Sequence, residues 1–413
     1  MAVGGLSKNA RNDFCDSWNI DMNNNHQENQ MLDIFARIKP PKRFHLIFVL
    51  THKCNLSCTY CFENHRKDTE IVTSNADEEF IKKTIGEYLD NPSIGECEIT
   101  FFGGEPLLCA DVIKNVCEWT WSKKWKNDYV FFANTNGTVL TEEMKEWFQL
   151  NHSKIWLGLS LDGMESTQNR NRSGSFGKID IPFFLKTWTE QSIKMTIDPR
   201  QPLSFADDIM FLHSQGFSIN GTDFAEGFPI DWERMKKDVV REMDKLLNYY
   251  LTTDIIPAPI MGMWVDDCAA NNRTEPKKWC GAGTKMVAYD TDGKSYPCTY
   301  FSPLTFPSEK MEEIKSIDFS DMKLATDEEC SDCYIKPLCL TCYGANYAIN
   351  GSPNIRDKSK CAFTKIRALY SSKLLVERFF KREDYYIEKY PVQSLMLMEA
   401  AMKINELYKE VLT

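Results

Sequence analysis

The 413-residue chain lacks both long hydrophobic runs and an excess of positive charge. A helix that spans a bilayer needs about 20 consecutive apolar residues, and no stretch of this sequence approaches that length. Residues 1–19 also lack the apolar segment of a signal peptide, so the sequence predicts a cytoplasmic protein. The formal net charge of −10 disfavours nucleic acid and anionic membranes as partners, because both attract basic proteins.

Cysteine, in contrast, is abundant, with 15 residues. Disulfides are rare in cytoplasmic proteins, so clustered thiols indicate metal ligands. In the run THKCNLSCTYCFEN, Cys54, Cys58 and Cys61 have the spacing CxxxCxxC. Four cysteines saturate an iron–sulfur cube, so three leave one iron open to a substrate or cofactor. A structural zinc site is the alternative, but such sites need a fourth ligand, and His52 is too close in sequence to supply it easily.

Strand-like and helix-like patterns alternate through the first half of the chain. Helical patterns such as ADEEFIKKTIGEYLDN separate the apolar runs, which predicts βαβ units and a parallel sheet. Six such units resemble a partial (β/α)6 TIM-like barrel, in which reactive groups lie at the C-terminal ends of the strands. The predicted strands are residues 45–50, 97–102, 129–134, 155–163, 193–198 and 221–227.

The sequence predicts an α/β protein in four parts. An Asn-rich, polar N-terminal arm covers residues 1–44, and the partial barrel covers 45–262. An irregular cysteine-rich iron–sulfur domain follows over 263–362. C-terminal helices cover 363–413, and their apolar stretches indicate that they pack against the rest of the protein.

The cysteine-rich part contains a second set of thiols. Close CxxC spacing lets two thiolates bind one metal or cluster, and Gly293, four residues before Cys298, suits a tight turn. The remaining cysteines outside both sets fit no motif and are predicted to be small buried hydrophobes. The second set is Cys268, Cys280, Cys298, Cys330, Cys333, Cys339, Cys342 and Cys361, and the unassigned cysteines are Cys15, Cys97, Cys109 and Cys117.

These motifs together make the chain resemble a radical SAM enzyme with a C-terminal SPASM (twitch-type) domain. The barrel motif covers roughly residues 45–230 and the SPASM pattern roughly 280–361. The resemblance implies that S-adenosylmethionine (AdoMet) binds the open iron and yields a 5′-deoxyadenosyl radical, which abstracts hydrogen from a substrate. This chemistry belongs to the cofactor, while the protein orients the reactants and excludes water. The resemblance also implies three [4Fe–4S] clusters and a flavodoxin or ferredoxin as reductant.

The same resemblance assigns the ligands of two auxiliary clusters. Cys268 either completes the first cluster or leaves it with an open iron. The last step of the four-cysteine run is usually x3 in the family and is x2 here, which bears on the assignment of Cys342. Carried over, the first cluster takes Cys280, Cys298 and Cys342, and the second takes Cys330, Cys333, Cys339 and Cys361.

Residues for the cofactor follow from the family motifs as well. The GGEP motif is Gly103, Gly104, Glu105 and Pro106, with Glu105 expected to accept hydrogen bonds from the methionine ammonium. The other assignments are Tyr60 beside the adenine, Ser160 at the ribose or carboxylate, Arg172 at the carboxylate with Arg170 as its competitor, and Asn136 and Asp162 at strand ends, where turn formation is the alternative role.

SPASM enzymes of this type mostly modify peptides or proteins. The sulfatase-maturating branch carries an aspartate base directly after the cysteine that stands here as Cys298, but this chain has Thr299, which cannot act as a base near neutral pH. We therefore expect a peptide maturase that installs an intrapeptide thioether or carbon–carbon crosslink. The alternatives are formylglycine formation, a small-molecule radical dehydrogenase or decarboxylase, and a non-catalytic electron carrier.

Many such maturases have a leader-recognition domain ahead of the barrel. Only about 44 residues precede the barrel here, so we expect a separate leader-recognition protein, or barrel loops, to hold the precursor peptide. No catalytic residue is assigned beyond the cluster site.

Overall fold

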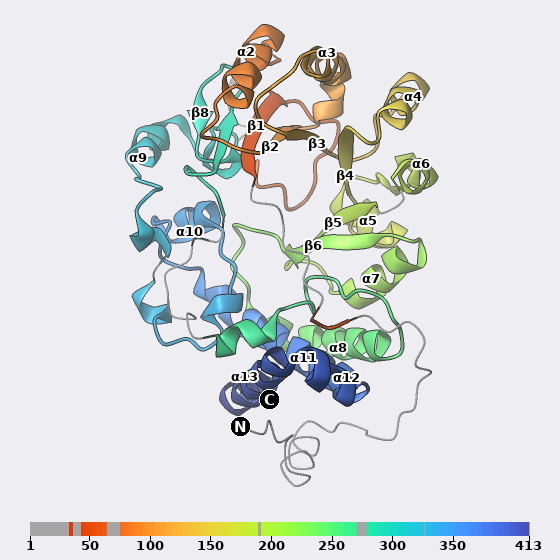
Figure 1. The fold of residues 1–413 in the computed structure, drawn as a ribbon, viewed down its shortest axis with the longest axis vertical. Helices are drawn as coiled ribbons and strands as arrows, with labels where there is room; N and C mark the ends of the chain where they lie inside the picture. The colour runs from red at the N-terminus through yellow and green to blue at the C-terminus, as the bar shows by residue number, and fades with distance from the viewer. Residues whose placement is uncertain are drawn as a thin grey trace.

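The computed structural model describes residues 33–35, 43–63, 75–188, 191–270, 278, 280–325 and 327–412. Its centre is an eight-stranded sheet with the order β6-β5-β4-β3-β2-β1-β7-β8. Figure 1 shows the strands as an arc, with helices α2 to α7 on the outer side and the cysteine-rich segment on the inner side. Most of the predicted N-terminal arm lies outside the described residues.

The first six strands are parallel and confirm the predicted partial barrel. The sixth begins three residues earlier than predicted, because a register shift beside Ile193 and Lys194 lets the polar run SING join the sheet. The strands are β1 Phe44–Thr51, β2 Cys97–Gly103, β3 Tyr129–Thr135, β4 Ile155–Ser160, β5 Ser192–Ile197 and β6 Ser218–Phe224.

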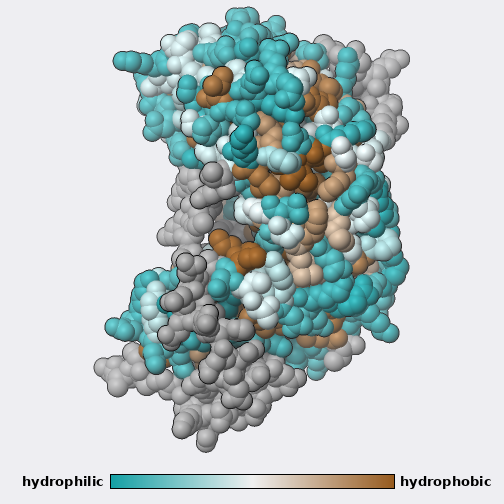
Figure 2. Space-filling view, turned by 90° about the vertical axis from the view of Figure 1, so that its right-hand side faces the viewer, coloured by the Kyte–Doolittle hydropathy of each residue, from teal (hydrophilic) through white to brown (hydrophobic). Residues whose placement is uncertain are grey.

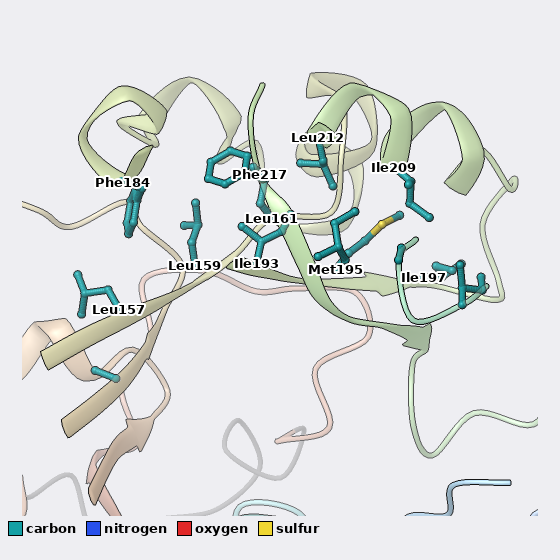
Figure 3. Packing of buried hydrophobic residues seen from close by; sticks show 14 of the residues in the cluster. Leu157, Leu159, Leu161, Phe184, Ile193, Met195, Ile197, Ile209, Leu212 and Phe217 are labelled. Atoms are coloured by element: carbon teal, nitrogen blue, oxygen red, sulfur yellow. The ribbon is translucent and has the colours of Figure 1, made fainter. Parts of the chain in front are cut away.

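Seven helices accompany these strands. Asp77, Thr141 and Asp231 cap three of them, since each side chain accepts a hydrogen bond from a backbone N–H of the first turn. Figure 3 shows Ile193, Met195 and other strand residues pointing toward the helices, so alternate strand residues point to the concave face. The helices are α2 Glu78–Leu89, α3 Ala110–Trp121, α4 Glu142–Leu150, α5 Glu165–Asn171, α6 Ile181–Thr187, α7 Phe205–Ser214 and α8 Trp232–Leu251.

Two further strands come from the cysteine-rich segment and extend the barrel sheet. β7 (Met286–Tyr289) runs parallel to β1, and β8 (Ser295–Tyr296) pairs with it in antiparallel fashion. Strands this short give too little alternation to be recognised in a sequence. Their pairing places the Cys298 loop beside the loop that follows β1, which holds the first cysteine motif.

The C-terminal region forms three helices rather than one continuous stretch: α11 (Cys361–Phe380), α12 (Glu383–Lys389) and α13 (Pro391–Tyr408). Pro391 suits the first turn of α13, where its missing N–H costs nothing. One side of α11 completes the barrel core, and its other side forms a second core with α13. The short helices α9 (Met311–Lys315) and α10 (Tyr343–Asn350) lie in the cysteine-rich segment.

The surface is predominantly polar. Hydrophilic residues cover most of the face in Figure 2, and apolar residues gather in patches near its middle. Within the described ranges, none of the helices combines the length and apolar character that a membrane crossing requires.

Candidate active site

The first cysteine motif lies on a loop that leaves the C-terminal end of β1. Cys54, Cys58 and Cys61 are all partly exposed and reduced. The loop turns tightly, with the backbone N–H of Cys61 donating to the carbonyl of Cys58 at 3.3 Å and that of Leu56 donating to the Cys54 sulfur at 3.4 Å. The three thiols therefore project from one compact loop, as ligands of a single cluster would.

Hydrogen bonds from the ends of neighbouring strands hold this loop. The Thr59 N–H donates to the Asn171 carbonyl at 2.9 Å, and its hydroxyl donates to Asp198 at 2.8 Å. Asn136, after β3, donates from Nδ2 to Oδ1 of Asn55 at 2.9 Å. The predicted Asn136 thus contacts the loop directly. Asp198 and Asn171, which belong to no recognised motif, also hold the loop in position.

The GGEP motif packs against the start of the same loop. Gly103 has a φ of +136°, and a Cβ there would lie 2.3 Å from the Thr51 carbonyl oxygen. A Cβ on Gly104 would lie 2.3 Å from the Lys53 carbonyl oxygen. The Gly104 and Glu105 N–H groups donate to those two carbonyls at 2.9 Å each. The close approach that the glycines allow is therefore to the cluster loop itself.

Glu105 is buried, with 1% of its surface exposed. Its carboxylate accepts hydrogen bonds from the Leu107 N–H (3.1 Å), the Thr135 hydroxyl (2.9 Å) and the Asn136 N–H (2.8 Å). Burial raises the pKa of this carboxyl, while the hydrogen bonds oppose that shift. A carboxylate has about four acceptor positions, so one remains for a ligand ammonium. Pro106 begins the 3₁₀ turn Pro106–Cys109 that follows.

The crowding at Gly104 gives a testable result. We expect Gly104→Ala to displace the cluster loop, because the new methyl group meets backbone atoms of Lys53 that cannot rotate away. Overpacking of this kind costs about 1–3 kcal/mol, and denaturant unfolding would measure the loss. The matched control is Gly177→Ala, since nothing lies within 4 Å of a Cβ there. Equal stability of the two variants would contradict the packing role of Gly104.

Asp162, directly beyond β4, is the centre of a buried hydrogen-bond network. It is fully buried, and its carboxylate accepts from the Tyr60 hydroxyl at 2.5 Å and from the Thr196 N–H at 3.1 Å. The Arg172 Nε lies 3.2 Å from Asp162 Oδ1, and Asn171 Nδ2 donates to Asp162 Oδ2 at 3.3 Å. The cluster loop, β5 and the end of α5 therefore meet at one carboxylate.

Arg172 is buried as well, and its guanidinium lies 5.3 Å from the centre of the Tyr60 ring. Burial disfavours its charge, but Asp162, Tyr60 and Cys58 together outweigh that effect and raise the pKa of Arg172. Burial likewise raises the pKa of Tyr60 well above its usual value. Arg170 is exposed and points its Nε toward Asn171 (3.4 Å). Of the two predicted arginines, Arg172 is the one at the site.

The first auxiliary set comes together in space. Cys280, Cys298 and Cys342 are close enough for their charges to influence one another. Burial raises the pKa of Cys298 to about 11 and that of Cys342 to about 12, and a bound metal would offset this by stabilising the thiolates. Cys342 thus lies with Cys280 and Cys298 despite the shortened spacing before it.

The second set lines one cavity of about 270 Å³. Lys358 Nζ lies 3.2 Å from the Cys330 sulfur and so places a cation beside this set. Cys342, which is assigned to the first set, also lines this cavity. The four thiols assigned to the second cluster suit a saturated iron–sulfur cube, and they are Cys330, Cys333, Cys339 and Cys361.

Cys268 is fully buried in the second apolar core, between residues of α11 and α13, together with Val265 and Leu338. Cys333 of the second set packs against the same core. Cys97, Cys109 and Cys117 are buried in the barrel core, as predicted, and Cys15 lies outside the described residues.

Within the described ranges, no three His, Cys, Asp or Glu side chains are close enough to hold a single metal ion. The cysteines of a cube bind separate irons and need not converge on one point.

An aromatic contact joins the two cysteine loops. Phe62, next to Cys61, stacks on Tyr300, two residues after Cys298, with ring centres 5.0 Å apart and planes within 7°. A Cβ on Gly344 would lie 2.4 Å from the Tyr300 ring, so that glycine makes room for it. Neither aromatic residue was singled out by the sequence analysis, because only the fold brings them together.

Comparison with known proteins agrees with this geometry. A cysteine-type anaerobic sulfatase-maturating enzyme of Clostridium novyi (strain NT) is 26% identical over 333 residues, which cover 71% of this chain and 86% of that protein. The subtilosin biosynthesis protein AlbA of Bacillus subtilis (strain 168) is 28% identical over 312 residues, which cover 69% of this chain and 63% of AlbA.

The fold is also that of a solved structure. Native anSMEcpe with bound AdoMet superposes with a TM-score of 0.60 at 20% identity, over 84% of this chain and 99% of that one. Residues 48–180 match the family model of the radical SAM superfamily, which implies AdoMet and a [4Fe–4S] cluster. Residues 48–180 therefore form a radical SAM domain, and the chain is similar to sulfatase-maturating and peptide-maturating enzymes.

Proposed function

We propose that this enzyme matures a ribosomally synthesised peptide by installing an intrapeptide thioether or carbon–carbon crosslink. The observation that carries the proposal is Thr299, which stands directly after Cys298, where the sulfatase-maturating branch has its aspartate base. Cys280, Cys298 and Cys342 lie together, and an open iron in their cluster would suit the thiolate of a substrate cysteine.

The ligand sets in this proposal are those that the fold brings together. Cys54, Cys58 and Cys61 hold the cluster that, with AdoMet, supplies the hydrogen-abstracting radical. Cys280, Cys298 and Cys342 would hold the first auxiliary cluster, and Cys330, Cys333, Cys339 and Cys361, which line the 270 Å³ cavity, would hold the second. The chain's own residues position these loops: Asp162 fixes Tyr60 and Arg172, and Glu105 fixes the end of β3.

We propose that AdoMet binds between these loops. The GGEP motif packs against the loop that holds the first cysteine motif, and Tyr60 belongs to that loop. Ser160 lies at the end of β4. We propose that the remaining acceptor position of Glu105 receives the methionine ammonium and that Arg172 lies beside the carboxylate. A flavodoxin or ferredoxin reductant and a separate leader-recognition protein complete the proposed system.

Formylglycine formation is the second candidate, and the similarity to sulfatase-maturating enzymes favours it. That reaction needs a base to deprotonate the substrate side chain. Thr299 stands at the position of the family's aspartate, and a hydroxyl does not accept a proton near neutral pH. The crosslinking proposal requires no base at that position and is therefore preferred.

The deciding experiment needs a candidate substrate, which a neighbouring small open reading frame encoding a Cys-rich or repeat-bearing peptide would supply. The purified, anaerobically reconstituted enzyme would be incubated with that peptide, AdoMet and a reductant, and the product analysed by mass spectrometry. We expect a loss of two hydrogen atoms for each crosslink, with all sulfur retained and with strict dependence on AdoMet. Loss of sulfur with gain of oxygen at a cysteine, or loss of two hydrogens at a serine to give a hydrazine-reactive aldehyde, would identify formylglycine formation instead. AdoMet cleavage without any change in the peptide would contradict both candidates.

A further inference from the structure

Lys194 is a cation on the concave face of the barrel. The residues before and after it in β5, Ile193 and Met195, are buried against the helices (Figure 3), so Lys194 points the opposite way. Lys194 is exposed although it lies in the middle of a central strand. Its ammonium therefore faces the open interior of the barrel, not the outer surface.

The neighbouring strands place Lys194 beside the candidate active site. It lies opposite Ser160, the last residue of β4. On the other side it lies opposite Gly221 of β6, where a Cβ would approach the Lys194 side chain to 3.3 Å. The glycine leaves space for the lysine stem and so lets the ammonium extend along the concave face.

Charged groups surround Lys194 on two sides. Protein atoms displace much of its water and lower the pKa of the ammonium, and the charge of Arg172 lowers it further. Glu226, Cys342 and Asp223 oppose that shift. The charges of Arg172 and of Cys342, a thiol of the first auxiliary set, therefore both act on the Lys194 ammonium.

The nearby acids already have other partners. Asp223 binds Arg367 at 3.1 Å, and Glu226 binds Lys360 at 2.6 Å. In the part of the chain that the structure describes, Lys194 Nζ has no carboxylate at ion-pair distance. Its charge is therefore available to a ligand, and a partly dehydrated cation favours an anionic one.

We infer that Lys194 is a substrate-binding residue that holds a carboxylate of the peptide between the two cluster loops. The inference rests on the proposed peptide-maturating function and adds a specificity: the peptide carries an Asp, a Glu or a free C-terminus near the residue that is modified. Arg172 is the cation assigned to the cofactor carboxylate, so the ammonium of Lys194 remains for the substrate. Because the same anionic group also occurs in AdoMet, the experiment compares both sources.

The test is a double-mutant cycle with the precursor peptide described above. Peptide variants that replace each Asp or Glu by its amide, and one with an amidated C-terminus, would be assayed with wild-type enzyme and with Lys194→Met. We expect Lys194→Met to raise the KM for the unmodified peptide about tenfold, because the variant loses one partly buried ion pair with the peptide. One amide variant should show the same rise with wild-type enzyme and no further rise with Lys194→Met.

Three comparisons make the result decisive. Lys194→Arg keeps the charge and should restore most of the affinity, which a loss through misfolding would not allow. Lys83→Met, on the exposed surface of α2, should behave as the wild type. AdoMet and decarboxylated AdoMet would be titrated into wild type and Lys194→Met. A loss of affinity confined to AdoMet would assign Lys194 to the cofactor and overturn the inference.

Other outcomes are equally clear. If every peptide variant responds alike in both enzymes, Lys194 binds no peptide carboxylate. If the wild-type enzyme modifies no peptide at all, the proposed function fails first and the inference fails with it. The two failures are distinguished by the wild-type reaction alone.

Discussion

The Cys58→Ser variant is expected to lose reductive cleavage of AdoMet completely while it keeps its auxiliary clusters. Cys58 is the middle ligand of the three-thiol loop, and its thiol lies close enough to Arg172 and Tyr60 to influence their pKa values. A hydroxyl is a poor substitute for a thiolate at iron, so the N-terminal cluster should not assemble. Iron should fall from about twelve to about eight atoms per chain, since each cube holds four.

Iron and sulfide analysis, together with chromatographic detection of 5′-deoxyadenosine, would measure this effect. Cys268→Ala is the matched control, because it removes a thiol that is buried in an apolar core. It should keep the full iron content and lose only the stability associated with a small cavity. A loss of iron in Cys268→Ala would show that this residue is a ligand, and would contradict the three-thiol composition of the first auxiliary set.

Much of the fold follows from local sequence patterns. The first six strands have strong apolar runs and turn residues at their ends, so the partial barrel could be predicted strand by strand. β7 and β8 could not, because four and two residues carry no usable periodicity. Their pairing with β1 depends on the fold of the whole cysteine-rich segment.

The candidate site, like the fold, could be predicted only in part from the sequence. Cysteine spacing and the GGEP motif identified the loops, since ligand geometry restricts which spacings work. Spacing could not decide the role of Cys268, which depends on its burial among α11 and α13. The Phe62–Tyr300 stack and the unpaired Lys194 were also missed, because both arise from contacts between residues far apart in sequence.

Asp162 shows how a residue with two plausible roles is resolved by its contacts. In the sequence, SLDG fits a simple turn. In the structure the carboxylate has four hydrogen-bonding or ionic partners, including Tyr60 of the cluster loop and the buried Arg172. A turn residue at the surface would have none of these. Asp162 therefore connects the cofactor residues to the barrel.

Asp162→Asn should consequently be among the most destabilising single substitutions in this chain. The amide keeps the shape but removes the negative charge, which leaves the Arg172 guanidinium buried without its counter-ion. Breaking a buried ion pair in this way costs about 3–5 kcal/mol. Denaturant unfolding of the cluster-free protein would measure the loss without interference from metal binding.

Two comparisons isolate the buried charge as the cause. Asp238→Asn breaks an exposed ion pair with Arg241, and pairs of that kind contribute only about 0–1 kcal/mol. Adding Arg172→Met to Asp162→Asn removes the unpaired guanidinium, so the double variant should recover part of the lost stability even though it has lost both partners. A double variant that is less stable than Asp162→Asn alone would show that Arg172 stabilises the fold through contacts other than this ion pair. Recovery would instead mean that the Asp162 carboxylate is required mainly because a cation is buried beside the cluster loop.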